Sequence, residues 1–167
     1  MKDKVFDGWS IEKECFDKIC EILDDNSTII EFGSGRVSEE LSKKFNVYSV
    51  EHNKEWVNKY KTKYIHAPLV KQQDIEYPWY DINILKNSLP VNIDLILIDG
   101  PPAGKSSPTS RWGFIKNIDI FGDLKKTILI FDDIQREDDM NHMIAVAEKL
   151  NRKFEIFKKD KMFGIIY

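Results

Sequence analysis

Asp94-Leu-Ile-Leu-Ile-Asp99-Gly-Pro-Pro102 is a short apolar run that ends in a carboxylate and a forced turn. Two other segments repeat this design: Thr28-Ile-Ile-Glu-Phe-Gly-Ser-Gly35 ends in glycines, and Thr127-Ile-Leu-Ile-Phe-Asp-Asp133 ends in two carboxylates. Each pattern predicts a buried strand that delivers polar or glycine residues at its carboxyl end. Ligands bind at that edge of an open parallel sheet, so these segments indicate both the fold and the place of the functional site.

The rest of the chain alternates predicted strands with predicted helices. Further strands are expected at 47–50, 64–66, 154–157 and 163–167, the last two as a hairpin around 158–161. Helical periodicity or helix-compatible sequence is found at 11–23 after Ser10 as N-cap, at 35–44, 55–60, 84–87, 114–121 and 140–150. The apolar strands imply burial on both faces. The pattern predicts a Rossmann-like, doubly wound α/β fold, with a mostly parallel seven-stranded sheet and a C-terminal antiparallel hairpin strand.

Composition narrows the class of protein. The 167 residues suit a single domain, 1–167, in which residues 1–25 supply an N-terminal helix that covers the sheet. A net charge of −3 is not typical of a domain that binds nucleic acid. No apolar run is long enough for a membrane span. Cys15 and Cys20 share one amphipathic segment at a spacing that suggests neither a disulfide nor a metal pair. We therefore expect a cytoplasmic protein without nucleic-acid or membrane partners.

The turn Gly33-Ser34-Gly35 lies where a strand passes into a helix, and its glycines let a ligand approach the backbone. Glu51 ends the next strand, where a carboxylate can accept hydrogen bonds from both hydroxyls of a ribose. Ser38 and Glu39 stand where the dinucleotide fingerprint needs its third glycine, and Glu31 would repel a pyrophosphate. A nucleoside without phosphates therefore fits better than NAD, although a plain strand-to-helix connection would also use such a turn.

The order of these motifs resembles that of the class I S-adenosylmethionine (SAM)-dependent methyltransferases. Glu31-x-Gly33-x-Gly35 is similar to their motif I, Glu51 to the acidic residue of motif II and Asp94–Asp99 to motif IV, over roughly residues 9–167. The resemblance implies a SAM site in which the glycine turn packs on the methionine and ribose, and Glu51 holds the ribose hydroxyls. His52 and Ala67 would border the adenine, though His52 could also be a surface histidine. The implied cofactor residues are Glu31, Gly33, Ser34, Gly35, Glu51, His52, Ala67 and Asp99.

Three carboxylates, Asp99, Asp132 and Asp133, follow strands that should be neighbours in this topology. Without local cations they would repel one another, and a hard ion such as Mg²⁺ would resolve the repulsion. The set resembles the metal site of the catechol and caffeoyl-CoA O-methyltransferases, with Asp133 where those enzymes have Asn. A metal there would bind a substrate hydroxyl and lower its pKa. The alternative is that these aspartates cap the turns that follow them.

Other residues could take part without a metal. Asp99 or His142 could act as a general base, and Arg111 could clamp an acidic group of the substrate through its guanidinium. His142 could equally be a helix-surface histidine, and Arg111 an ordinary surface arginine. Gly104-Lys105-Ser106 lacks the upstream glycine of a P-loop, which argues against a nucleoside triphosphate site.

These observations predict a SAM-dependent methyltransferase that O-methylates a sugar, a glycan precursor or another small hydroxylated molecule, with or without Mg²⁺. Two alternatives remain open: a metal-independent N-methyltransferase, and a non-catalytic module that binds SAM or another nucleoside. The acceptor pocket is expected from residues 1–10, 69–90 and 101–112, and a homodimer could complete it. Trp9, Trp79 and Tyr80 could either cover this pocket or pack in the core.

Overall fold

A mixed sheet forms the centre of the computed structural model, which describes residues 5–6, 10–158 and 161–167. Its strands lie in the order β3-β2-β1-β6-β7-β9-β8. They are β1 (Thr28–Phe32), β2 (Asn46–Glu51), β3 (Lys63–His66), β6 (Leu95–Ile98), β7 (Ile128–Phe131), β8 (Phe154–Lys158) and β9 (Met162–Ile166). The first five are parallel, and β9 runs antiparallel between β7 and β8. The predicted doubly wound sheet with its C-terminal hairpin is confirmed.

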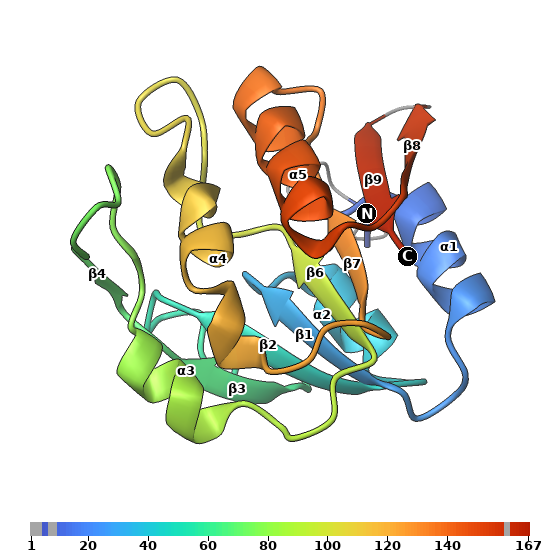
Figure 1. The fold of residues 1–167 in the computed structure, drawn as a ribbon. Coiled ribbons are helices and arrows are strands. Elements are labelled where there is room, and N and C mark those ends of the chain that lie inside the picture. The colour runs from blue at the N-terminus through green and yellow to red at the C-terminus, as the bar shows by residue number, and fades with distance from the viewer. Residues whose placement is uncertain (1–4, 7–9, 159–160) are drawn as a thin grey trace.

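Helices cover both faces of the sheet (Figure 1). They are α1 (Lys13–Ile22), α2 (Arg36–Leu41), α3 (Ile82–Ser88), α4 (Gly113–Lys116) and α5 (Glu137–Leu150), with short 3₁₀ turns η1 (Ser110–Trp112) and η2 (Ile118–Phe121). Side chains alternate along each strand, so Ile30 packs toward α3, α4 and α5 while Ile29 packs toward α1 and α2. This two-sided burial explains why the central strands are apolar throughout. No helix of the described residues could span a membrane.

Local structure differs from the predictions in a few places. Helix α1 begins at Lys13 with Glu12 at the N-cap, and Ser10 is a buried residue before the helix rather than its cap. Residues 55–60 form turns instead of a helix, and Asn58 adopts a positive φ of 64°. A small hairpin of β4 (Leu69–Val70) and β5 (Trp79–Tyr80) lies in the segment that had no regular pattern.

The register of the parallel strands places the ends of the predicted functional segments beside one another. Phe32 at the end of β1 lies beside Val50 of β2 and Ile98 of β6, and Ile98 lies beside Phe131 of β7. The residues that follow these strand ends therefore meet at a single edge. The strand order reverses between β1 and β6, and this switch point is where open α/β sheets bind ligands.

Candidate functional site

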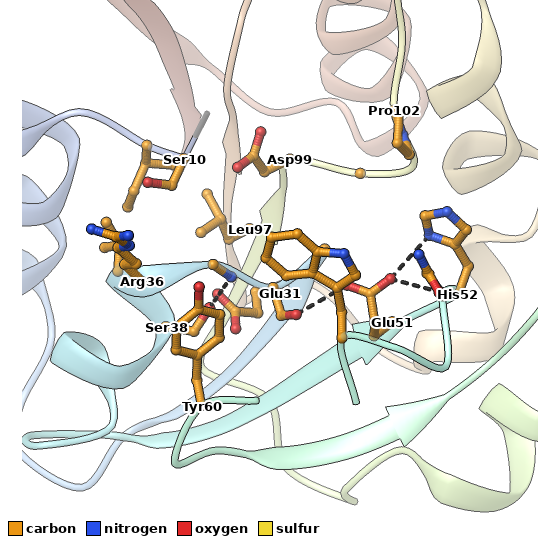
Figure 2. A pocket seen from close by; sticks show the side chains of 18 of the residues that line it. Ser10, Glu31, Arg36, Ser38, Glu51, His52, Tyr60, Leu97, Asp99 and Pro102 are labelled. Atoms are coloured by element: carbon orange, nitrogen blue, oxygen red, sulfur yellow. Dashed lines mark hydrogen bonds and ion pairs between the residues drawn. The ribbon is translucent and has the colours of Figure 1, made fainter. Parts of the chain in front are cut away.

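A cavity of about 580 Å³ opens at the carboxyl ends of β1, β2 and β6. Figure 2 shows its lining, with Glu51 beside His52 and with Ser10 and Asp99 on another part of the wall. Most of the residues predicted for the cofactor line it: Glu31, Gly33, Ser34, Gly35, Glu51, His52 and Asp99. The topology therefore brings together residues that lie far apart in the sequence.

The glycine turn adopts the backbone conformation that its sequence suggests. Gly33 has a φ of 92°, which a side chain would disfavour, and its N–H donates to the Val50 carbonyl at 2.9 Å. Gly35 caps α2, and its N–H donates to Ser38 Oγ at 2.9 Å. The turn thus leaves its backbone against the cavity without a bulky side chain.

Glu31 lies beneath this turn and is almost fully buried, with 4% of its surface exposed. Burial raises the pKa of Glu31 to about 7, although hydrogen bonds with Ser38 and Ser49 act in the opposite direction. A cationic group of a ligand placed here would favour the ionised form. Glu31 can therefore serve as a partner for an ammonium group.

Glu51 is held differently at the end of β2. It accepts hydrogen bonds from Ser34 Oγ at 3.0 Å and from the backbone N–H of Asn53 at 2.9 Å, and His52 Nδ1 lies 3.1 Å from its Oε1. Burial raises the pKa of Glu51, but the interactions with His52, Asn53 and Ser34 outweigh it, so the net pKa lies below the usual value. Glu51 is thus an ionised acceptor, fixed in place and facing the cavity.

Aromatic side chains complete the cavity wall, and the sequence analysis assigned them no binding role. Trp56 and Tyr60 line it, with ring centroids 6.4 Å apart, and Figure 2 labels Tyr60 below Glu31. The sequence signal is the pair Trp56 and Tyr60, which comes shortly after Glu51-His52 in the segment predicted as a helix. Ala67 is completely buried and is not part of the lining, and its N–H bonds the Glu51 carbonyl at 3.0 Å.

Tyr80, whose role the sequence left open, reaches the cavity from β5. Its hydroxyl is buried and has no hydrogen-bond partner in the described part of the chain. Trp79 is buried in the core beside it, and Trp9 lies outside the described residues. Tyr80 thus borders the cavity, but its hydroxyl is enclosed by the surrounding residues and is not open to a ligand.

Asp99, Asp132 and Asp133 converge as predicted, each offering an oxygen within 4.8 Å of the others. Contrary to the premise of the metal prediction, cations lie among them. Lys161 Nζ is 2.6 Å from Asp132 Oδ2 and 2.8 Å from Asp133 Oδ1, and Arg136 Nη2 is 2.5 Å from Asp133 Oδ2. The cluster is an ion-pair network in which the chain itself supplies the positive charge.

The pKa values within the network diverge. Burial and the neighbouring Asp132 raise the pKa of Asp99 well above its usual range, although Arg111 and Lys161 lower it in part. Burial also raises the pKa of Asp133, but Lys161, Arg111 and Arg136 outweigh that effect and the net pKa is lowered. Asp99, which lines the cavity, therefore holds a proton more readily than Asp133 does.

Arg111 is neither a surface residue nor placed to clamp a substrate. Its side chain is almost entirely buried and donates to the carbonyls of Asp99 at 2.7 Å, Asp132 at 3.1 Å and Pro101 at 3.3 Å. It also lies 3.1 Å from Asp133 Oδ2. The guanidinium therefore ties the loop after β6 to the strand ends, and its donors already face internal acceptors.

His142 lies in the core and not on a helix surface. None of its surface is exposed, its ring stacks on Trp112 at 5.6 Å, and the Phe131 ring is 5.2 Å away. Burial, and to a lesser degree Arg111, lowers the pKa of His142 to about 3. It does not line the cavity, so this placement contradicts both sequence interpretations, the general base and the surface histidine.

Several solved structures of other proteins have a fold similar to that of this chain. No family model and no curated protein matches the chain. Among solved structures, a putative caffeoyl-CoA O-methyltransferase from Staphylococcus aureus is similar at 14% identity, with 94% of this chain and 84% of that chain covered and a TM-score of 0.60. An E. cuniculi Mtq2–Trm112 complex, described as responsible for methylation of the translation termination factor eRF1, is similar at 15% identity, 94% coverage of both chains and a TM-score of 0.50.

A human methyltransferase 10 domain containing protein is also similar, at 14% identity, 84% coverage of this chain, 70% of that chain and a TM-score of 0.50. These structures share the layered sheet described above. The fold of this chain is that of these methyltransferase structures.

Proposed function

We propose that this protein is a SAM-dependent methyltransferase that methylates a hydroxyl group of a small molecule without a divalent metal. The observation that carries the proposal is the cavity at the switch point. Its lining joins the ionised Glu51, the buried Glu31 and the glycine turn on one side to Asp99 on the other. When bound, SAM supplies a methyl group on a sulfonium, which is transferred by in-line displacement.

The lining residues fit the parts of SAM by their chemistry. Glu51 keeps lone pairs beyond those used by Ser34 and Asn53, and would accept from the ribose hydroxyls. Glu31 would pair with the ammonium group of the methionine part. The faces of Trp56 and Tyr60 would pack against the adenine.

Asp99 supports transfer to oxygen. A hydroxyl must lose its proton as the new C–O bond forms and the C–S bond breaks, and the raised pKa of Asp99 suits a carboxylate that accepts that proton. The similar Staphylococcus aureus structure is described as a putative O-methyltransferase. A sugar, a glycan precursor or another hydroxylated small molecule is therefore the acceptor class that we propose.

Divalent metal ions do not fit the carboxylates, because Lys161, Arg111 and Arg136 already pair with them. No step of the proposed reaction therefore passes through a metal. Catalysis would depend on positioning the acceptor oxygen in line with the methyl group, and on the proton transfer to Asp99.

Calorimetric titration with S-adenosylhomocysteine tests the cofactor assignment. We expect binding in the presence of either Mg²⁺ or EDTA, loss of binding in Glu51→Gln, and unchanged binding in Glu55→Gln, a control at an exposed glutamate of the next segment. Failure of the wild-type protein to bind under both conditions would overturn the assignment.

Turnover with methyl-labelled SAM and a panel of hydroxylated and amine acceptors tests the reaction. A labelled methyl ether that forms equally well in EDTA is the expected product. An N-methylated product would favour the N-methyltransferase alternative, and binding without turnover on any acceptor would favour the non-catalytic module.

A further inference from the structure

The ammonium of Lys161 lies where a divalent ion would be expected. It comes from the turn before β9, and it bridges Asp132 and Asp133 at 2.6 and 2.8 Å. Both carboxylates follow β7, and Asp99 from β6 completes a set of oxygens within 4.8 Å of one another. One compact cation therefore joins the C-terminal hairpin to the strand ends at the site where the carboxylates converge.

This contact is well shielded from water. Only 14% of the Lys161 side chain and 1% of the Asp132 side chain are exposed. Burial lowers the pKa of Lys161, but the carboxylates of Asp132 and Asp99 outweigh that effect and the net pKa is raised. Lys161 therefore stays charged, and its charge acts on Asp132 and Asp133 at short range.

A metal ion would have to displace this ammonium. Mg²⁺ binds carboxylate oxygens at about 2.0–2.1 Å, and Lys161 Nζ already pairs with Asp132 Oδ2 and Asp133 Oδ1, one oxygen of each carboxylate. The guanidinium groups of Arg111 and Arg136 lie 3.1 and 2.5 Å from Asp133 Oδ2. A divalent ion would therefore bring its charge close to several fixed cations.

We propose that Lys161 is a resident cation that replaces a divalent ion at this sheet edge, and that removal of its ammonium uncovers a latent metal site formed by Asp99, Asp132 and Asp133. Lys161 is in this view a positioning residue, which holds the two β7 carboxylates and fixes the hairpin against them. The inference goes beyond the proposed methyl transfer and does not depend on the cavity binding SAM.

Titration with Mn²⁺, followed by the electron paramagnetic resonance signal of the free ion, tests the proposal on the full chain. The wild-type protein and Lys158→Met, a control at an exposed lysine of the same hairpin, are expected to leave the Mn²⁺ free. Lys161→Met should bind one Mn²⁺ at least about tenfold more tightly than the wild type. Adding Asp133→Asn to Lys161→Met should abolish that site.

Two results would overturn the proposal: tight Mn²⁺ binding by the wild-type protein, or Lys161→Met with a Mn²⁺ affinity no higher than that of the wild type. If Lys161→Met does not fold, Lys161→Gln, which also removes the charge but keeps a polar side chain, takes its place in the same titration, and a Mn²⁺ affinity no higher than that of the wild type again overturns the proposal. Titration of the same samples with S-adenosylhomocysteine separates this question from the cofactor assignment. A wild-type protein that binds neither ligand would contradict the proposed function and leave this inference standing.

Discussion

The Ser34 hydroxyl donates a hydrogen bond of 3.0 Å to Glu51 Oε2 and so joins the turn after β1 to the end of β2. This contact fixes the carboxylate that we propose as the ribose acceptor. Ser34→Ala should lower the affinity for S-adenosylhomocysteine by about fivefold, as expected for one hydrogen bond worth about 1 kcal/mol. Calorimetry measures the change, and Ser42→Ala, whose hydroxyl bonds the Glu39 carbonyl at the other end of α2, is the control. Equal affinities for both variants would contradict the role of this contact.

Glu31 should make stability depend on pH. Its pKa is raised from 4.5 to about 7, so between these values the unfolded chain has lost a proton that the folded chain still holds. Wild-type stability should therefore fall as pH rises through this window and level off above it. Glu31→Gln has no titrating group at this position, so its stability lacks this fall. The free energy of unfolding of Glu31→Gln minus that of the wild type should therefore increase by up to about 3 kcal/mol between the two ends of the window.

Urea unfolding at about pH 5 and about pH 8 measures this difference. Glu148→Gln, at an exposed glutamate of α5, should show no such change relative to the wild type. A constant difference between Glu31→Gln and wild type at both pH values would show that Glu31 is not protonated in the folded state.

Gly100 follows Asp99 where the backbone passes close to its neighbours. A Cβ atom there would lie 2.5 Å from the Tyr80 hydroxyl and 2.8 Å from the Phe32 carbonyl oxygen. Gly100→Ala should therefore destabilise the protein by about 1–3 kcal/mol through overpacking. Gly104→Ala is the matched control, because no described heavy atom lies within 4 Å of its Cβ position. Chemical denaturation should rank the two variants in this order, and similar stabilities would refute the close approach.

A substitution of Arg111 distinguishes a residue that holds the loop and the strand ends together from one that binds the substrate. Removing its guanidinium leaves buried carboxylates and carbonyls without their donor, so Arg111→Met should lose about 3–5 kcal/mol of stability. Denaturant unfolding of the variant gives the value directly. A variant of normal stability whose only defect is a raised KM would instead support the clamp.

Much of the carboxyl edge of the sheet could be predicted because its residues follow strands that are recognisable from local sequence. Apolar runs that end in Gly33, Glu51 and Asp99 predict strand ends, and parallel topology then places these ends together. The sequence alone therefore predicts that these residues gather at one edge of the sheet, where they line the cavity. Ala67 was misplaced because a residue that follows a strand can turn its side chain into the core as readily as into a cavity.

The charges that compensate the aspartates could not be predicted in the same way. Lys161 belongs to a turn rich in lysine, a composition typical of solvated loops, and only the antiparallel pairing of β9 with β7 brings it to Asp132. His142 shows the same limit. Its periodic position on α5 is compatible with several faces of the helix, and the aromatic rings around it come from distant segments.

Arg111 also closes the loop that follows β6. It bonds the carbonyls of Asp99 and Pro101, and Ser110 Oγ bonds the Pro102 carbonyl at 2.9 Å, so both ends of the loop are fastened to each other and to the strand. Between these ends, Arg136 Nη1 donates to the Ala103 carbonyl at 2.9 Å and Thr109 Oγ1 donates to Glu76 Oε2 at 3.2 Å, so residues 104–108 form the part of the loop between its anchored ends. Pro102, at the start of this loop, lines the cavity beside Asp99 and Gly100. We therefore expect changes in the length or sequence of the loop to alter access to Asp99 while the glycine turn on the other side of the cavity keeps its form, so this loop is where we would engineer a new acceptor preference.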